Sequence, residues 1–320
     1  MKTSGFLHDE FFVWKHDLKE ELRSGSLTVR TERGRMEWAL SGETGPFVIG
    51  CHGGPGGYDQ VFILNPSLNA RGFKVFAWSR PGYLRTPLKV ARKFEEQADA
   101  LVLLMDKLKI ERAALTGFSA GGPVALHFAL RHPDRIWALI LECAVTRRYI
   151  IDPENMEEKL LYSRLMFNDP MVWIYHLLAE HAPRSMFKSV LEMESTLSEA
   201  QIQDLLTEIM HDADKVQTLM GLIKSMSPSS MRRTGLVNDL KQLARLKRIP
   251  LEQIAVPTLV VHGRHDSDVS FEHAEYAADR IPGAELFAVE NGFHIMPVCE
   301  CADEVTERKV EFLQKHMPRN

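Results

Sequence analysis

Residues 115–123 read LTGFSAGGP, and this stretch decides how the rest of the chain is interpreted. It contains the pattern Gly117-x-Ser119-x-Gly121, which is typical of the sharp strand-to-helix turn that presents a serine hydroxyl above a parallel sheet. The same serine also suits the N-cap of a helix, because its oxygen can accept a hydrogen bond from an amide of the first turn. A buried strand before it, a helix after it and partners elsewhere in the chain would favour the catalytic interpretation.

Short apolar runs and helical patterns alternate along most of the chain. Two extended stretches, at 26–30 and 36–40, suggest an antiparallel hairpin. Consecutive apolar positions, typical of strands buried on both faces of a parallel sheet, occur at 46–51, 74–78, 113–116, 138–143, 258–262 and 285–289. Helices are expected at 94–109, 121–131, 271–280 and 302–316. The alternation predicts an α/β fold with a mostly parallel, doubly wound sheet of about eight strands, whose active site lies at the carboxyl ends of the strands.

Residues 146–249 interrupt this alternation. The segment has no convincing strand, and its helix-forming stretches are broken at Pro153, Pro170, Pro183 and Pro228. It is predicted to be an all-helical cap inserted into a core formed by residues 26–145 and 250–320.

The first 25 residues carry one apolar face. Leu7, Phe11, Trp14, Leu18 and Leu22 recur at three- and four-residue steps, which predicts an amphipathic helix over residues 1–25. We expect this face to pack on the body of the protein. A homodimer contact and a flap near the substrate entrance are the alternatives.

A serine hydroxyl needs a base to take its proton, and the base needs a carboxylate to orient it. Asp266 follows the predicted strand at 258–262, and His294 follows the one at 285–289. The chain order Ser, Asp, His is the order of triads built on this type of sheet. We therefore predict Ser119, Asp266 and His294 as the catalytic residues, with Asp268 as the alternative acid.

Five motifs stand in order at the predicted strand ends: HGGPGG (52–57), SRPGY (79–83), GFSAGG (117–122), HGRHD (262–266) and GFH (292–294). With them the chain resembles the α/β-hydrolase superfamily over about residues 26–316. The resemblance implies an α/β-hydrolase fold and a serine hydrolase that needs no cofactor. Its H-G-x-x-D spacing selects Asp266 over Asp268, and it makes Glu142, at another strand end, a pocket residue rather than the acid.

The resemblance also implies an oxyanion hole made by the backbone amides of Gly54 and Ala120. Two preorganised amides would stabilise the negative charge that develops on the carbonyl oxygen after attack by the serine. The glycine-rich loop could instead cradle a phosphate, but it has no Lys near its end. Residues expected to line the substrate pocket are Gly53, Tyr58, Phe118, Glu142 and Trp173.

Neighbouring polar residues are given structural roles. Potential metal ligands are close together in sequence at His262, His265, Asp266 and Asp268. Their spacing places them on no common face of a helix or strand, so no metal site is predicted. His52 is expected to brace its loop, and Arg80 to fix another through hydrogen bonds.

The functional prediction is hydrolysis of carboxylic esters or lactones of small to medium, largely apolar substrates. Nine of the 14 Met residues lie in the predicted cap, where they form either an adaptable apolar surface or the cap's own core. The alternatives are a carbon–carbon bond hydrolase, a non-enzymatic receptor for a small ligand, and a proline iminopeptidase-like aminopeptidase. The aminopeptidase usually has Trp where this chain has Ala120, and it needs acids to hold a free amino group, for which Glu142, Glu154, Glu157 and Glu158 are candidates.

Composition limits the partners. The 320 residues are 45% hydrophobic and 26% charged, and 39 basic and 43 acidic side chains are mixed along the chain, with a formal net charge of −4. This argues against a nucleic-acid partner and for a small-molecule substrate. Four cysteines without zinc spacing, and the lack of a signal pattern or of a long apolar run, predict a cytoplasmic protein with no stable membrane insertion.

Overall fold

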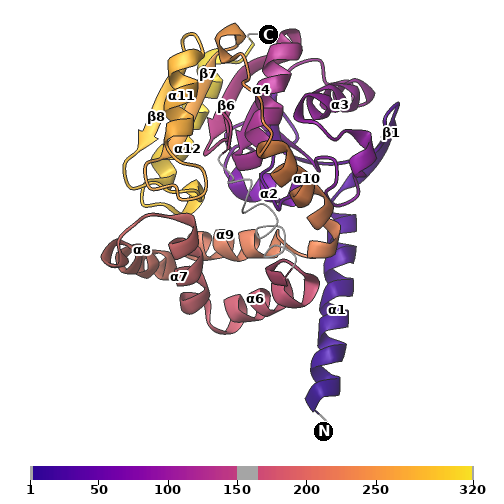
Figure 1. Cartoon of the computed structure of the whole chain (residues 1–320), viewed down its shortest axis with the longest axis vertical. Coiled ribbons are helices and arrows are strands. Elements are labelled where there is room, and N and C mark those ends of the chain that lie inside the picture. The colour runs from indigo at the N-terminus through magenta and orange to yellow at the C-terminus, as the bar shows by residue number, and fades with distance from the viewer. Residues whose placement is uncertain (1–2, 150–164, 319–320) are drawn as a thin grey trace.

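A computed structural model of the chain describes residues 3–149 and 165–318 (Figure 1). Within these residues it contains an eight-stranded sheet in the order β1-β2-β4-β3-β5-β6-β7-β8. The strands are β1 Leu27–Thr31, β2 Gly34–Ser41, β3 Phe47–Cys51, β4 Lys74–Trp78, β5 Ala113–Phe118, β6 Ile136–Glu142, β7 Thr258–Gly263 and β8 Glu285–Val289. β1 and β2 form an antiparallel hairpin, and β2 is antiparallel to β4. All later neighbours pair in parallel, so the predicted α/β class with a mostly parallel sheet is confirmed.

Helices cover both faces of the sheet, because its central strands are apolar on consecutive positions. Every residue of β6 is buried. On β3, Val48 packs into the core on one face and Ile49 into the core on the other. The helices of the core are α2 Tyr58–Leu64, α3 Phe94–Lys107, α4 Gly122–Arg131, α11 Glu272–Arg280 and α12 Ala302–His316. Helices α2 and α12 pack on the first face, and α3, α4 and α11 pack on the second.

The helices between β6 and β7 are α6 Asp169–His181, α7 Pro183–Glu194, α8 Glu199–His211, α9 Ala213–Lys224 and α10 Arg233–Leu243. Figure 1 shows α6 to α9 grouped beyond one end of the sheet, with α10 running back along the core. Met186, Met210, Met220 and Met226 are half-buried against the main core of this region. Pro153, Met156, Tyr162 and the three glutamates proposed to hold an amino group lie outside the described residues.

Helix α1 (Thr3–Ser24) packs on the body from Phe11 to its C-terminal end. Leu18 and Leu22 are buried, and Phe11 lies against Trp173 of α6 with 5.5 Å between the ring centroids. Lys15 pairs with Asp169 at 2.5 Å. The other end of α1 extends beyond the body of the protein (Figure 1), and Phe12 and Val13 are exposed. None of the described helices is apolar over a length that could cross a membrane.

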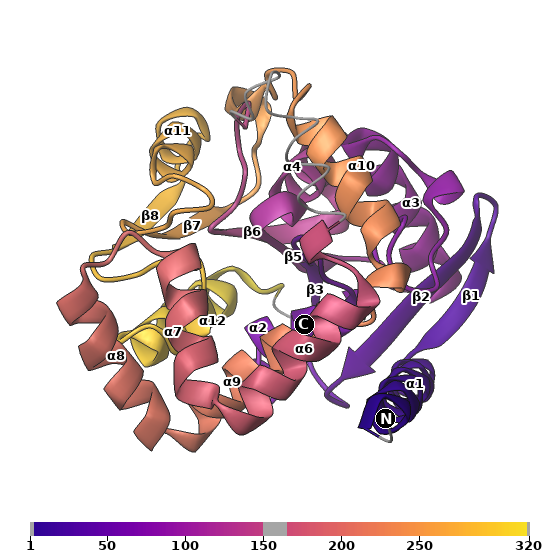
Figure 2. The same ribbon diagram turned by 60° about the horizontal axis from the view of Figure 1, so that its bottom comes forward.

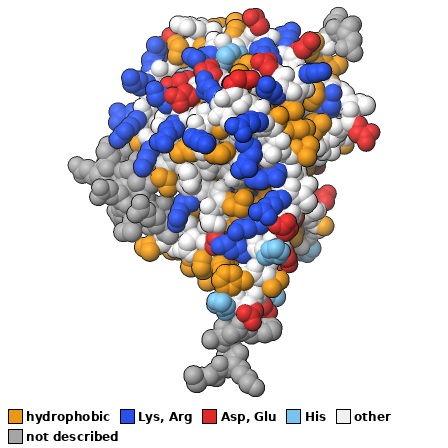
Figure 3. Space-filling view, turned by 90° about the vertical axis from the view of Figure 1, so that its right-hand side faces the viewer, with side chains coloured by type: hydrophobic (Ala, Val, Ile, Leu, Met, Phe, Trp, Pro, Cys, Tyr) orange, Lys and Arg blue, Asp and Glu red, His pale blue; other side chains and the backbone are white. Residues whose placement is uncertain are grey.

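Basic and acidic side chains are mixed along the sequence, but the basic ones cluster on part of the surface. Figure 3 shows Lys and Arg side chains gathered in a band across one face of the molecule. Exposed basic residues come from the segment before α3 and from α10 with the residues after it, namely Lys89, Arg92, Lys93, Arg233, Lys241, Arg245, Lys247 and Arg248. Segments more than a hundred residues apart in sequence therefore contribute basic side chains, which composition alone does not indicate.

Candidate active site

Ser119 lies in the turn between β5 and α4, where the sequence predicted it. Its φ is +51°, a left-handed conformation that is costly for a residue with a side chain and is typical of functional turns. The serine is buried, and its carbonyl accepts a hydrogen bond from the amide of Val145 at 3.1 Å, which ties the turn to the chain after β6.

Two glycines allow this turn to pack. A Cβ atom on Gly121 would lie 2.1 Å from the carbonyl oxygen of Cys51, and one on Gly117 would lie 2.8 Å from the Cβ of Ala125. Both distances are too short for any larger residue. The Gly-x-Ser-x-Gly pattern therefore has a steric reason in this fold: the turn is wedged between β3 and the start of α4.

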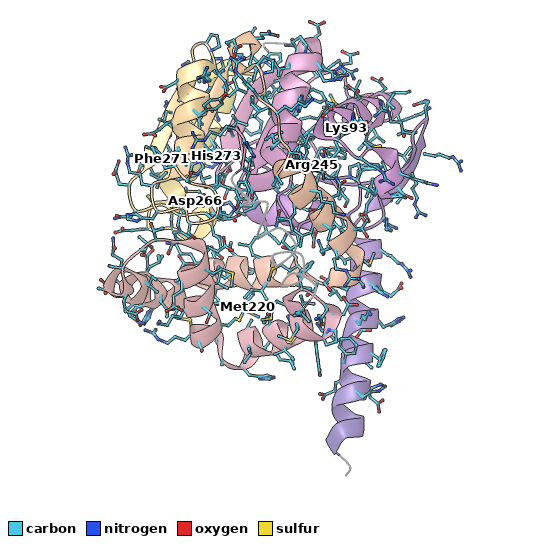
Figure 4. All side chains as sticks on the ribbon, in the orientation of Figure 1. Lys93, Met220, Arg245, Asp266, Phe271 and His273 are labelled. Carbon is cyan, nitrogen blue, oxygen red and sulfur yellow. The ribbon has the colours of Figure 1, made fainter. Side chains whose placement is uncertain are left out.

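Asp266 and His294 meet at the ends of β7 and β8. Nδ1 of His294 lies 2.8 Å from Oδ2 of Asp266. The other carboxylate oxygen of Asp266 accepts the amides of Asp268 at 3.0 Å and Val269 at 2.8 Å. Figure 4 shows Asp266 at the end of the core that faces the cap. The carboxylate is thus held to orient the imidazole through its Nδ1 atom.

Asp268 lies on the other side of the same imidazole. Its Oδ2 is 3.5 Å from Nε2 of His294, and its side chain is 49% exposed. Glu194, the last residue of α7, joins this group, and donor atoms of Glu194, Asp268 and His294 all lie within 4.8 Å of one another. The two aspartates are therefore not alternatives for one position, since each faces a different nitrogen of the histidine.

These carboxylates govern the ionisation of the site. Burial alone lowers the pKa of His294, but Asp266, Asp268 and Glu194 together outweigh it and raise the pKa to about 10. Asp266 shows the complementary effect: burial raises the pKa of its carboxyl group, yet His294 and His262 bring it well below the usual range. Burial raises the pKa of Glu194 to about 7, against the opposing effect of His294.

Ser119 directly follows Phe118, a neighbour of His294, but Ser119 and His294 are not hydrogen-bonded in this conformation. The ring of Phe118 lies 4.9 Å from the imidazole of His294, measured between centroids. No hydrogen bond of the Ser119 hydroxyl occurs among the described residues, and Nε2 of His294 faces Asp268 instead. Catalytic hydrogen bonds are often long or poorly aligned without substrate, so the geometry remains compatible with proton transfer from the serine.

Residues 193–196, which end α7 and lead toward α8, are bonded to both loops that carry the Asp–His pair. The amide of His294 donates to the carbonyl of Glu194 at 3.3 Å, and that of Thr196 donates to His265 at 2.8 Å. Ser195 forms a β-bridge with Asp266. The end of α7 is thereby tied directly to the residues predicted to act as acid and base.

The glycine-rich loop after β3 lies beside the serine. A Cβ on Gly53 would be 3.0 Å from the Cβ of Ser119. The amide of Gly53 already donates to Gln60 at 2.9 Å, so Gly54 is the next amide along the loop that could serve an oxyanion. Ala120 follows the serine at the start of the turn.

His52 and Arg80 hold this loop, in agreement with the roles expected from sequence. The amide of Arg80 donates to Nε2 of His52 at 2.9 Å, and Nε of Arg80 donates to the carbonyl of His52 at 2.8 Å. Burial first, and the charge of Arg80 second, bring the pKa of His52 well below its ordinary value, so this histidine is neutral. Arg80 also pairs with Asp239 of α10, with 3.0 Å between Nη1 and Oδ1. The loop is thus anchored to α10.

Three residues expected to line the pocket have side chains that contact helices α1 or α12. The hydroxyl of Tyr58 donates to the carbonyl of Leu22 at 2.9 Å, because α1 lies over the start of α2. Trp173 packs against Phe11 of α1. Glu142 pairs with Lys309 of α12 on one face of the sheet. Gly53 and Phe118, by contrast, do lie beside Ser119 or His294.

Glu194 and Asp239 were not identified from the sequence. Each lies in a helix between β6 and β7, outside the sheet motifs, and no motif marks it. Their shared signal is only an acidic residue on an amphipathic helix, which is usually a solvated position. The fold brings Glu194 close to the imidazole of His294, and it brings Asp239 to the buried guanidinium of Arg80.

Imidazole, carboxylate and thiol donors also gather here in sets that could bind a metal ion. Glu194, Asp268 and His294 form one such set, and Cys143, Asp266 and His294 form another, each with donor atoms within 4.8 Å. The first set has the harder ligands, which suit a divalent cation such as Mn²⁺ or Zn²⁺. A metal-free and cofactor-free reaction stays a prediction.

A sequence model of the family described as alpha/beta hydrolase fold matches residues 46–298. The uncharacterized hydrolase YcgS of Bacillus subtilis (strain 168) is 28% identical over 291 residues, which is 90% of this chain and 98% of that protein. The solved structure of an alpha/beta hydrolase fold protein from Nakamurella multipartita has a TM-score of 0.83 and 35% identity, covering 90% of this chain and 99% of its own.

A third similarity concerns a protein with a stated reaction. The 2-hydroxy-6-oxononadienedioate/2-hydroxy-6-oxononatrienedioate hydrolase of Comamonas testosteroni is 25% identical over 316 residues, covering 93% of this chain and 98% of that enzyme. The span matched by the family model includes Ser119, Asp266 and His294.

Proposed function

Since the chain belongs to the alpha/beta hydrolase fold family and is a hydrolase of that fold, we propose that it cleaves carboxylic esters or lactones through an acyl-enzyme on Ser119. The substrates are small to medium and largely apolar. The observation that carries this proposal is the 2.8 Å contact between His294 and Asp266, beside a serine held at φ +51° on the strand-to-helix turn.

The reaction begins at the serine. Neutral His294 takes the hydroxyl proton on Nε2 while Oγ of Ser119 bonds to the carbonyl carbon, and Asp266 stabilises the imidazolium that forms. The amides of Gly54 and Ala120 donate to the carbonyl oxygen as it becomes negative. The bond to the leaving alkoxide then breaks, and His294 returns the proton to that alkoxide.

Water completes the cycle. His294 deprotonates a water molecule as its oxygen adds to the acyl carbon. The bond to Ser119 then breaks to release the carboxylic acid, and His294 returns the proton to Oγ of Ser119 to restore the hydroxyl. The cap supports this sequence by covering the strand ends and limiting the access of bulk water. Residues 193–196 hold the loops of Asp266 and His294 against the cap.

The direct test is covalent labelling of the nucleophile. An alkyl fluorophosphonate should add to Ser119 and abolish turnover of short p-nitrophenyl esters, with the adduct located by peptide mass spectrometry. Ser119→Ala should take up no label and lose at least about 10³-fold in kcat, since nothing replaces the nucleophile. An adduct on another residue, or ester turnover that survives in Ser119→Ala, contradicts the proposal.

Carbon–carbon bond hydrolysis is the second candidate, favoured by the similarity to the Comamonas testosteroni enzyme over 93% of the chain. A panel of p-nitrophenyl esters, lactones and vinylogous 1,5-diketones separates the two. The ester proposal expects esters or lactones to give the highest kcat/KM. A higher value for the diketones would replace it with the second candidate.

The ionisation of His294 predicts a dependence of activity on pH. The histidine acts as a base only when neutral, so kcat/KM should rise as pH rises through its pKa. Glu194→Gln removes a charge that stabilises the imidazolium and should move this rise to lower pH by about one unit. Activity at pH 7 should therefore increase if substrate binding is preserved.

The matched control is Glu192→Gln on the same helix, because Glu192 is exposed and pairs with Lys188 rather than with the histidine. Its pH profile should coincide with that of the unmodified protein. An unchanged profile in Glu194→Gln would show that this carboxylate does not act on His294.

A further inference from the structure

A cavity lies beside the sheet, at the end of β6. It has a volume of about 680 Å³, within the range of small-molecule sites. Its walls come from α2, α9, α12 and the turn Met296–Val298, and Figure 2 shows these three helices close together. Ser119, Asp266 and His294 are not among its lining residues.

We propose that this cavity binds an organic cation, with an ammonium group at its acidic wall and a short aliphatic chain against its apolar side. The proposal does not depend on the hydrolytic function assigned to Ser119. It rests on the cavity, on a buried carboxylate with an unused oxygen, and on an imbalance of charge in the walls.

Glu142 supplies the unused acceptor. The residue is 3% exposed, lies at the end of β6 and lines the cavity. Its Oε2 pairs with Lys309, whereas its Oε1 is buried and receives no hydrogen bond from any described residue. A buried carboxylate oxygen without a donor is unfavourable. An ammonium group at this wall would supply the missing N–H.

The basic side chains of the wall are already neutralised. Lys309 pairs with Glu142 and also donates to Asn65 at 3.1 Å. Lys215 pairs with Glu208 and donates to the carbonyl of Cys299 at 3.0 Å. Neither lysine is free to hold an anion.

Further carboxylates in the walls are not neutralised. The members of this group are Asp212, Asp214, Glu300 and Asp303. None of them forms an ion pair with a basic group in the part of the chain that the structure describes. Asp212 caps α9 through the amides of Asp214 and Lys215, which uses one oxygen but not its charge. The excess of negative charge favours a cation.

The remaining wall of the cavity is apolar and therefore favours a ligand with a carbon chain. It is formed by Phe62, Ile63, Leu64, Met296 and Val305. A carbon chain lying on these side chains would remove apolar surface from water while its ammonium group faces the acids. A bare inorganic cation would leave this part of the cavity unused.

The test compares three ligands of equal chain length on the full chain by isothermal titration calorimetry: n-hexylammonium, n-hexanol and hexanoate. Hexylammonium should bind at least tenfold more tightly than hexanol and should weaken as salt rises from 20 to 300 mM. In methyl-labelled protein, its binding should shift the NMR signals of Leu64 and Val305. Equal affinity for the alcohol and the amine, or shifts confined to other methyl groups, would overturn the proposal.

Variants of acids at the rim of the cavity test whether the amine binds there or is attracted by the negative charge of the protein as a whole. Asp214→Asn with Asp303→Asn should lower the affinity for hexylammonium at least threefold. The control pair is Asp134→Asn with Glu275→Gln, because these are also exposed acids in first helical turns but lie outside the cavity. The control should bind as the unmodified protein does, and an equal loss in both pairs would contradict the assigned site.

Phosphonylated protein distinguishes this proposal from the one on Ser119. Binding of hexylammonium should persist after the serine is labelled. Loss of binding on labelling would place the amine in the reaction centre and overturn the separate site. Failure of Ser119 to react, with amine binding intact, would count only against the hydrolytic mechanism.

Discussion

Asp266→Asn should lower kcat about 10⁴-fold, whereas Asp268→Asn should change it less than tenfold. Asp266 accepts from Nδ1 of His294 at 2.8 Å and leaves Nε2 as the nitrogen that can take the proton of the serine. An amide at this position can donate to Nδ1 and thereby favour the wrong tautomer. Asp268 instead lies 3.5 Å from Nε2, so its removal affects the charge of the ring but not its orientation.

The comparison needs both proteins folded and saturated with substrate. Steady-state kinetics with the best p-nitrophenyl ester give kcat, and thermal melting shows whether each variant keeps the fold. The two substitutions remove the same charge two residues apart, so each controls for the other. A large loss in Asp268→Asn with a small one in Asp266→Asn would reverse the assignment of the acid.

Asp239→Asn should destabilise the protein by about 3 kcal/mol, because it leaves the guanidinium of Arg80 buried without its counter-ion. The side chains of Arg80 and Asp239 are 0% and 2% exposed. Tyr83 donates to the same carboxylate at 2.6 Å, so the substitution also disturbs a second buried group. Since Arg80 holds the loop of His52 to the cap, activity should fall together with stability.

Urea denaturation followed by fluorescence measures this change as a lower midpoint. The control is Glu252→Gln, which removes a carboxylate from an exposed pair with Arg248. Pairs of this kind contribute little to stability, and its midpoint should match that of the unmodified protein. A midpoint for Asp239→Asn equal to that of the control would show that the buried pair does not support the fold.

Sheet strands were the most readily predicted part of the fold. All eight were expected from local pattern within a few residues. Six were expected from apolar residues on successive positions, which are typical of strands buried on both faces, and β1 and β2 were expected as an extended hairpin. Helix α2 was not expected, since its seven residues form only two turns and give too short a periodic pattern. The limits proposed for the cap and for the core remain a prediction.

Motif residues placed at strand ends were also predictable, but their surroundings were not. The Gly-x-Ser-x-Gly pattern reflects a steric requirement within a few residues, and it appears in the sequence for that reason. Tyr58 and Trp173 were expected at the pocket from their type and position, yet their neighbours come from α1. Contacts between distant segments leave no local pattern to read.

The sequence by itself determined the class of the fold, the order of its strands and helices, and the positions of Ser119, Asp266 and His294 at strand ends. These follow from periodicity, turn sterics and motif spacing, which act over short stretches of chain. Only the tertiary structure decided that Glu194 and Asp268 surround the imidazole, that Asp239 neutralises Arg80, and that Glu142 opens on a separate acidic cavity. The physical reason is that charge and burial depend on every group within a few ångströms, and those groups come from all parts of the chain.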